Sequence, residues 1–68
     1  MDMRKLVGTN AARLRHASGL TQEQLAERSG LSQQYISGLE GGQRNPTVLT
    51  LFELATALNA EVVDFFQV

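Results

Sequence analysis

Apolar residues recur along this chain at the three- and four-residue spacing of amphipathic helices, and no stretch alternates apolar and polar residues as a half-buried strand would. The spacing predicts five helices. They cover about residues 3–17, the segments from Thr21 to Gly30, from Ser32 to Gly41 and from Thr47 to Asn59, and a short segment from about Glu61 to Phe66. We therefore expect an all-α fold, with residues 1–68 forming a single domain.

Residues that favour helix ends stand at the expected boundaries. Thr21 and Gln24 have the spacing of a capping box, in which each side chain binds an unpaired backbone N–H of the other residue. Ser32 and Thr47 are expected to cap the third and fourth helices. The predicted stops are Gly19, Gly30, Gly41–Gly42 and Asn59, and Asn45–Pro46 predicts a turn.

The same spacing predicts which side chains face the core. They are Val7, Ala11 and Leu14 in the first helix, Leu25 and Ala26 in the second, Ile36 and Leu39 in the third, and Val48, Leu51, Phe52, Ala55 and Leu58 in the fourth. A chain of 68 residues is only marginally stable alone, and without cysteine it has no disulfide. Stability must then come from helix packing, good caps or a partner subunit.

Composition and charge exclude several classes of function. His16 is the single histidine, and the chain has no cysteine, so we expect no metal site and no cofactor. Paired carboxylates, a nucleophile with a base and a phosphate-binding loop are all missing from the sequence, so an enzyme is not expected. No apolar stretch approaches the roughly 20 residues of a membrane span, and no secretion signal is recognisable, which favours the cytoplasm.

The charges are unevenly distributed, although the net charge is only −1. Residues 1–34 contain five basic and three acidic side chains, whereas residues 35–68 contain one basic and four acidic side chains. The mildly basic first half is weak support for a nucleic-acid partner.

The segment from Gln22 to Leu39 has the pattern of a helix-turn-helix. Two short predicted helices are separated by Gly30-Leu31-Ser32, where glycine suits a turn that needs positive φ. Ala26 is small at the point where the two helices would cross closely. The second helix of the pair is then presented outward.

Residues 21–40, TQEQLAERSGLSQQYISGLE, resemble the helix-turn-helix of the Cro and lambdoid phage repressor family, also called XRE-like regulators. The resemblance extends to Leu14–Arg15, to Gly19–Gln22, to Asn45–Thr47 and to Leu51–Phe66, and so covers about residues 6–66. It implies a five-helix, lambda-repressor-like fold. It also implies a transcriptional regulator that binds double-stranded DNA, in the first place a repressor, and that is found with the nucleoid.

In this family the third helix lies in the major groove, and its first residues reach the base edges. A glutamine amide can donate to and accept from adenine N6 and N7 together. We therefore expect base contacts from Ser32, Gln33, Gln34, Ser37 and Gly38, with Gln33 the foremost. Gly38 has no side chain, which indicates either close approach of another backbone or a lost contact.

Phosphate contacts are expected on either side of that helix. Gln22 starts the second helix, where free N–H groups attract anions, and the resemblance implies that it also braces Gln33. The loop residues Gln43, Arg44 and Asn45 are expected to contact the DNA backbone. The resemblance further implies a structural ion pair between Arg15 and Glu40.

Tyr35, Arg4 and Lys5 allow two interpretations each. Tyr35 could stack or contact the backbone of DNA, or it could be partly buried against the first helix. Arg4 and Lys5 could approach DNA, or they could only make the terminus soluble. His16 is expected to be an exposed helix residue.

The C-terminal third is richer in apolar side chains than one short helix can bury. Leu49, Val62, Val63 and Phe66 are predicted to form a homodimer interface, with extra core and a frayed tail as the alternative. A two-fold dimer would place two recognition helices about 34 Å apart on a short inverted repeat. The rival function is a protein-interaction module, such as an antitoxin, whose main partner is a toxin or another regulator.

Overall fold

The computed structural model describes residues 1–68. Its elements follow in the order α1 (Met3–Ala17), α2 (Gln22–Ser29), α3 (Gln33–Glu40), α4 (Val48–Leu58) and the 3-10 helix η1 (Val62–Phe66). The predicted all-α class is confirmed, and the fifth predicted helix is a 3-10 turn rather than an α-helix. None of the helices is both long and apolar enough to span a bilayer.

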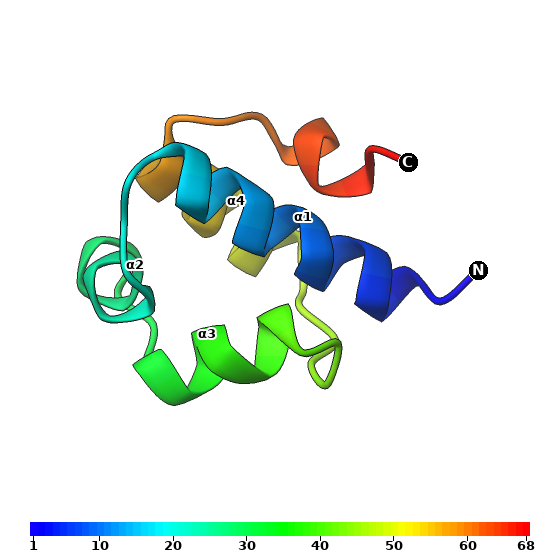
Figure 1. The fold of residues 1–68 in the computed structure, drawn as a ribbon, viewed down its shortest axis with the longest axis horizontal. Coiled ribbons are helices and arrows are strands. Elements are labelled where there is room, and N and C mark those ends of the chain that lie inside the picture. Colours follow the sequence, from blue (N-terminus) through cyan, green and yellow to red (C-terminus); the bar gives the residue numbers. More distant parts are fainter.

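Helix α1 runs through the middle of the domain, with α3 on one side and η1 on the other (Figure 1). Helix α2 packs against α3 and α4, and α4 also contacts η1. This arrangement sets α2 and α3 at one side of the molecule, with α3 at its edge (Figure 1).

The predicted starts at Thr21, Ser32 and Thr47 and the predicted stops at Gly30 and Asn59 are confirmed. Each start depends on a hydrogen bond between residues close in sequence, which is why the sequence could predict it. Thr21 Oγ1 accepts from the Gln24 N–H at 3.1 Å, and Gln24 Oε1 accepts from the Thr21 N–H at 2.9 Å. Ser32 and Thr47 cap α3 and α4 in the same manner, each by accepting an N–H three residues later. Gly30 and Asn59 end α2 and α4 in the left-handed conformation.

One core joins all the elements. Its fully buried large side chains are Leu25, Ile36, Leu39, Leu54 and Phe65. Gly8 of α1 allows the backbones of α1 and α3 to touch, since a Cβ at this position would collide with the carbonyl oxygen of Leu39. Helix α3 is therefore held both by its own apolar face and by direct backbone contact with α1.

The prediction that Val48 and Phe52 of the fourth helix face the core is wrong. Val48 and Phe52 are 77% and 59% exposed, whereas Leu54, which the prediction omitted, is fully buried. Eight of the eleven residues of α4 are apolar, so two overlapping faces fit a helical spacing. The face that packs inward is the one with the spacing i, i+3, i+4 and i+7, namely Leu51, Leu54, Ala55 and Leu58.

The C-terminal turn η1 is fixed to α1 by a buried asparagine. The Asn10 side-chain amide donates to the carbonyl oxygens of Phe65 at 2.8 Å and of Gln67 at 2.9 Å. Arg13 adds a bond from Nη2 to the Asp64 carbonyl at 3.3 Å. These bonds hold the short 3-10 helix η1 against α1, with Phe65 inserted in the core.

Candidate nucleic-acid interface

The first half of α3 presents neutral polar side chains to solvent. Ser32, Gln33, Gln34 and Ser37 are all exposed, while Ile36 and Leu39 on the opposite face are fully buried. The buried pair fixes the rotation of the helix about its axis, and therefore fixes which residues face outward. The exposed groups are amides and hydroxyls, each able to donate and to accept a hydrogen bond.

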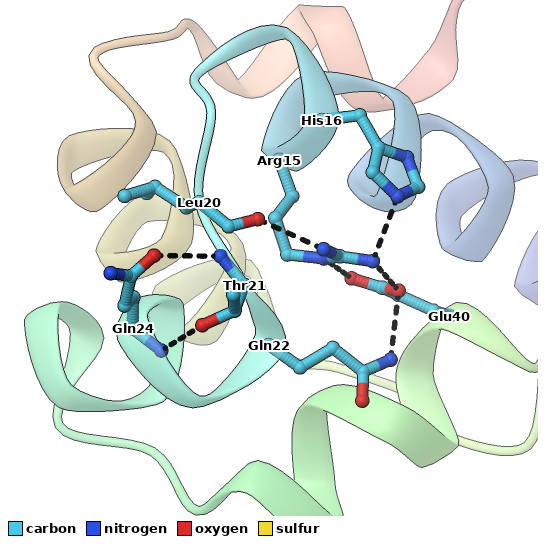
Figure 2. A network of polar contacts seen from close by, with 7 residues as sticks. All are labelled: Arg15, His16, Leu20, Thr21, Gln22, Gln24 and Glu40. Atoms are coloured by element: carbon cyan, nitrogen blue, oxygen red, sulfur yellow. Dashed lines mark hydrogen bonds and ion pairs between the residues drawn. The ribbon is translucent and has the colours of Figure 1, made fainter.

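The one ionised residue of α3, Glu40, is neutralised inside the domain. Its carboxylate binds Arg15 through two bonds, from Nε at 2.7 Å and from Nη2 at 2.9 Å (Figure 2). The two side chains are only 10% and 8% exposed. Arg15 Nη1 also donates to the Leu20 carbonyl at 2.9 Å, so the same guanidinium ties α1, the α1–α2 loop and α3 together.

This pairing shifts the pKa of both Arg15 and Glu40. The hydrogen bond from Arg15 to Glu40 raises the pKa of Arg15. Burial of the Glu40 carboxyl acts to raise its pKa, but the hydrogen bonds from Arg15 and Gln22 and the nearby positive charge outweigh burial and leave that pKa below its ordinary value. Both charges are thus held at neutral pH.

Gln22 is half-buried at the start of α2 and is held by the same carboxylate. Its Nε2 donates to Glu40 Oε1 at 3.0 Å, and its amide oxygen points away from Glu40 (Figure 2). The hydrogen bonds of the structure include none between Gln22 and Gln33, so the bracing partner of Gln22 here is Glu40. The second Nε2 hydrogen and the backbone N–H at the helix start remain available for a phosphate.

The loop between α3 and α4 contributes the three other predicted phosphate contacts. Gln43, Arg44 and Asn45 are exposed, and the N–H of Gln43 donates to the Gly38 carbonyl at 2.9 Å. Arg44 is the only cationic side chain after Arg28. Its guanidinium carbon lies 5.2 Å from the centroid of the Tyr35 ring, so the loop charge lies next to α3.

A second, apolar surface lies on α4 and η1. Of the four predicted interface residues, Leu49, Val63 and Phe66 are 67%, 70% and 40% exposed, and Val62 is half-buried against the core. Val48 and Phe52 of α4 are also exposed, although sequence reasoning had placed both in the core. Val48 and Phe66 line one groove of about 190 Å³ together with Met3, Pro46 and Leu51.

Other candidate chemistry does not gather into a site. No three His, Cys, Asp or Glu side chains are placed to hold a metal ion. His16 is exposed, with its Nε2 3.3 Å from Arg15 Nη2 (Figure 2).

The chain is similar to known proteins both in sequence and in fold. Residues 11–65 match the helix-turn-helix family HTH_3. The chain is 66% identical over 64 residues to the uncharacterized HTH-type transcriptional regulator y4dJ of Sinorhizobium fredii, covering 94% of this chain and 83% of that protein. It is 45% identical over 62 residues to the control protein C.SmaI of Serratia marcescens, covering 91% of this chain and 74% of that one.

Among solved structures, the restriction-modification controller protein C.AhdI of Aeromonas hydrophila superposes with a TM-score of 0.89 and 43% identity, over 93% of this chain and 91% of that chain. The fold, the capped α2–α3 pair and the sequence identity all indicate the same family. The chain therefore belongs to the helix-turn-helix family of Cro/C1-type, or XRE-like, transcriptional regulators.

Proposed function

We propose that this chain is a sequence-specific transcriptional regulator, in the first place a repressor, that binds double-stranded DNA as a homodimer on a short inverted repeat. Residues 1–68 act as one domain that carries both the DNA surface and the dimer surface. One observation carries the proposal: α3 and its N-cap Ser32 expose four neutral hydrogen-bonding side chains, while the opposite face of the helix is buried. Its place of action is the nucleoid, in the cytoplasm.

In this mechanism α3 enters the major groove with its N-terminal end first. Gln33 and Gln34 lie on its first turn, where their amides can pair with adenine N6 and N7. Ser32 and Ser37 flank them with hydroxyl groups that bind to either donors or acceptors. The proposed base-contact surface is Ser32, Gln33, Gln34, Ser37 and the Gly38 position.

Phosphate contacts on both sides of α3 would set its register on the duplex. Gln22 offers its backbone N–H and the free hydrogen of its amide, and it is held in place by Glu40. Arg44, Gln43 and Asn45 would contact the phosphates that follow the α3 contacts. The buried Arg15–Glu40 pair supports the contact from Gln22 without touching DNA itself.

The dimer is proposed from the apolar surface on α4 and η1. Side chains as large as Leu49, Val63 and Phe66 are exposed in the monomer, and a second copy would remove them from water. In a two-fold interface, both copies contribute the same residues. It would also double the number of contacts that so small a domain makes with DNA.

Selection of bound sites from a random double-stranded DNA pool at moderate salt tests this function. The expected result is an enriched inverted repeat with half-sites about 34 Å apart, bound by two copies of the chain in light scattering. A protein that is folded by circular dichroism but enriches no sequence would refute the proposal. That result would favour the protein-interaction alternative, with a toxin or another regulator as the partner.

A further inference from the structure

The side chain of Arg44 fills the space that a side chain at position 38 would occupy. A Cβ built on Gly38 would lie 2.9 Å from Arg44 Nε and 3.3 Å from Arg44 Cγ. The shorter distance is below ordinary van der Waals contact, so a larger residue at position 38 would displace Arg44. The sequence left open why glycine stands here, and the structure shows close approach, by a side chain rather than by another backbone.

Tyr35 holds the other end of the same side chain. The Arg44 guanidinium lies over the Tyr35 ring at 5.2 Å, within the range of a cation–π contact. Tyr35 and Gly38 are three residues apart in α3 and therefore share one side of the helix. The stem of Arg44 rests on Gly38 while its charged end rests on Tyr35.

The backbone that leads to Arg44 is also tied to α3. The Gln43 N–H donates to the Gly38 carbonyl at 2.9 Å, so the residue immediately before Arg44 is bonded to the last turn of the helix. Arg44 is exposed to solvent, yet it is placed by three contacts with α3, through Gly38, Tyr35 and this backbone bond.

We propose that Gly38 and Tyr35 are positioning residues that hold the Arg44 guanidinium against α3, where it forms one DNA-binding surface with Gln34 and Ser37. Gln34 lies four residues before Gly38 and three before Ser37, so it shares one side of the helix with both of them. Arginine loses much rotamer freedom when it is ordered, and holding it before binding removes this cost from the complex. The inference rests on the proposed DNA-binding function and adds to it how the single loop cation is presented.

The first test uses the free protein and needs no DNA. The Arg44 guanidinium lies over the Tyr35 ring, so this ring is the expected source of an upfield ring-current shift on the Arg44 Hδ protons. Tyr35→Phe should keep that shift, whereas Tyr35→Leu and Gly38→Ala should abolish it. The matched control is Gly41→Ala, because a Cβ at Gly41 would meet only ordinary contacts at 3.5 Å or more and would not touch Arg44. An unshifted Arg44 in the unchanged protein overturns the proposal.

The second test is a double-mutant cycle on the selected DNA site. Gly38→Ala should weaken binding about two- to fivefold, the equivalent of one exposed cation–π contact, and should have no further effect when Arg44 is already alanine. Tyr35→Phe should bind as the unchanged protein does. Equal effects of Gly38→Ala with and without Arg44, or no effect at all, overturn the inference. Failure of the unchanged protein to select any DNA would instead refute the proposed function, and the ring-current test is read independently of it.

Discussion

The two proposed binding surfaces of this domain are opposite in character. Around α3 the exposed side chains are neutral amides and hydroxyls, and the only carboxylate of the helix is paired inside the domain. Around α4 and η1, Leu49, Phe52 and Val63 are each more than half exposed. Water solvates the first surface well and the second poorly. Exposure of the α3 surface is therefore favourable, whereas covering the α4–η1 surface would lower the free energy of the system.

The two surfaces also differ in how they are fixed to α1. Helix α3 is held by an ionic network, in which Arg15 binds Glu40 and Glu40 binds Gln22. The turn η1 is held by the neutral side chain of Asn10 and by the buried ring of Phe65. Because of this contrast, the two surfaces should respond differently to mutation and to pH.

The largest expected effect is on the apolar surface. Val63→Asp should weaken self-association by at least about 3 kcal/mol, roughly a hundredfold, because an ionised carboxylate would be desolvated at the interface without a partner. Light scattering and sedimentation over a concentration series measure the change. Val68→Asp is the matched control, since Val68 is 94% exposed and lies outside the proposed interface. An unchanged dimer in the Val63 variant would mean that the interface lies elsewhere.

The next effect is on the network beneath α3. Glu40→Gln leaves the buried Arg15 charge without its counter-ion and should lower the free energy of unfolding by about 3 kcal/mol. Chemical denaturation at pH 7 measures this loss. Glu27→Gln, an exposed acidic position on α2, should change stability little.

The same network predicts a pH dependence with a definite sign. The pKa of Glu40 is lower in the folded protein than its ordinary value of 4.5, so the unfolded state binds the proton more readily. The stabilisation is complete above that ordinary value and is lost as the pH falls through the lower folded value. Acid unfolding of Glu40→Gln should therefore be shallower than that of the unchanged protein. Equal acid profiles would contradict the assignment of this stability to Glu40.

How far the sequence could predict the molecule depends on the range of the contact involved. The caps at Thr21, Ser32 and Thr47 depend on residues three positions away, and all were predicted. The α4 core was partly wrong because its many apolar residues fit two helix faces, and only packing against the rest of the fold selects one of them.

Contacts between distant residues were beyond the local pattern. Asn10 binds carbonyls 55 and 57 residues away, and nothing near it in sequence names those partners. A signal did exist, since Asn10 shares the core-facing spacing of Val7 and Ala11, and a polar residue at such a position requires a buried partner. The contact between Arg44 and Tyr35 has no comparable signal, because it depends on the path of the loop.

A smaller effect is expected on the DNA surface alone. Gln33→Ala should cost about 1–3 kcal/mol at one base pair of each half-site and should leave the fold intact. Binding measured against a set of single base-pair variants of the selected site shows where discrimination is lost. Gln67→Ala, an exposed glutamine on the opposite surface, is the control and should bind as before. A uniform loss over all base pairs would assign Gln33 to the DNA backbone instead.

The smallest effect tests whether the two surfaces are independent. Asn10→Ala leaves the carbonyls of Phe65 and Gln67 without their donor and should lower the free energy of unfolding by about 1 kcal/mol. Hydrogen exchange should then accelerate at the Asp64 amide of η1 but not at the buried turns of α3, and dimer affinity should fall. Thr9→Ala, at the exposed neighbouring position, should alter neither. If exchange accelerates equally in α3 and η1, Asn10 supports the whole core, and the two surfaces share one local stability.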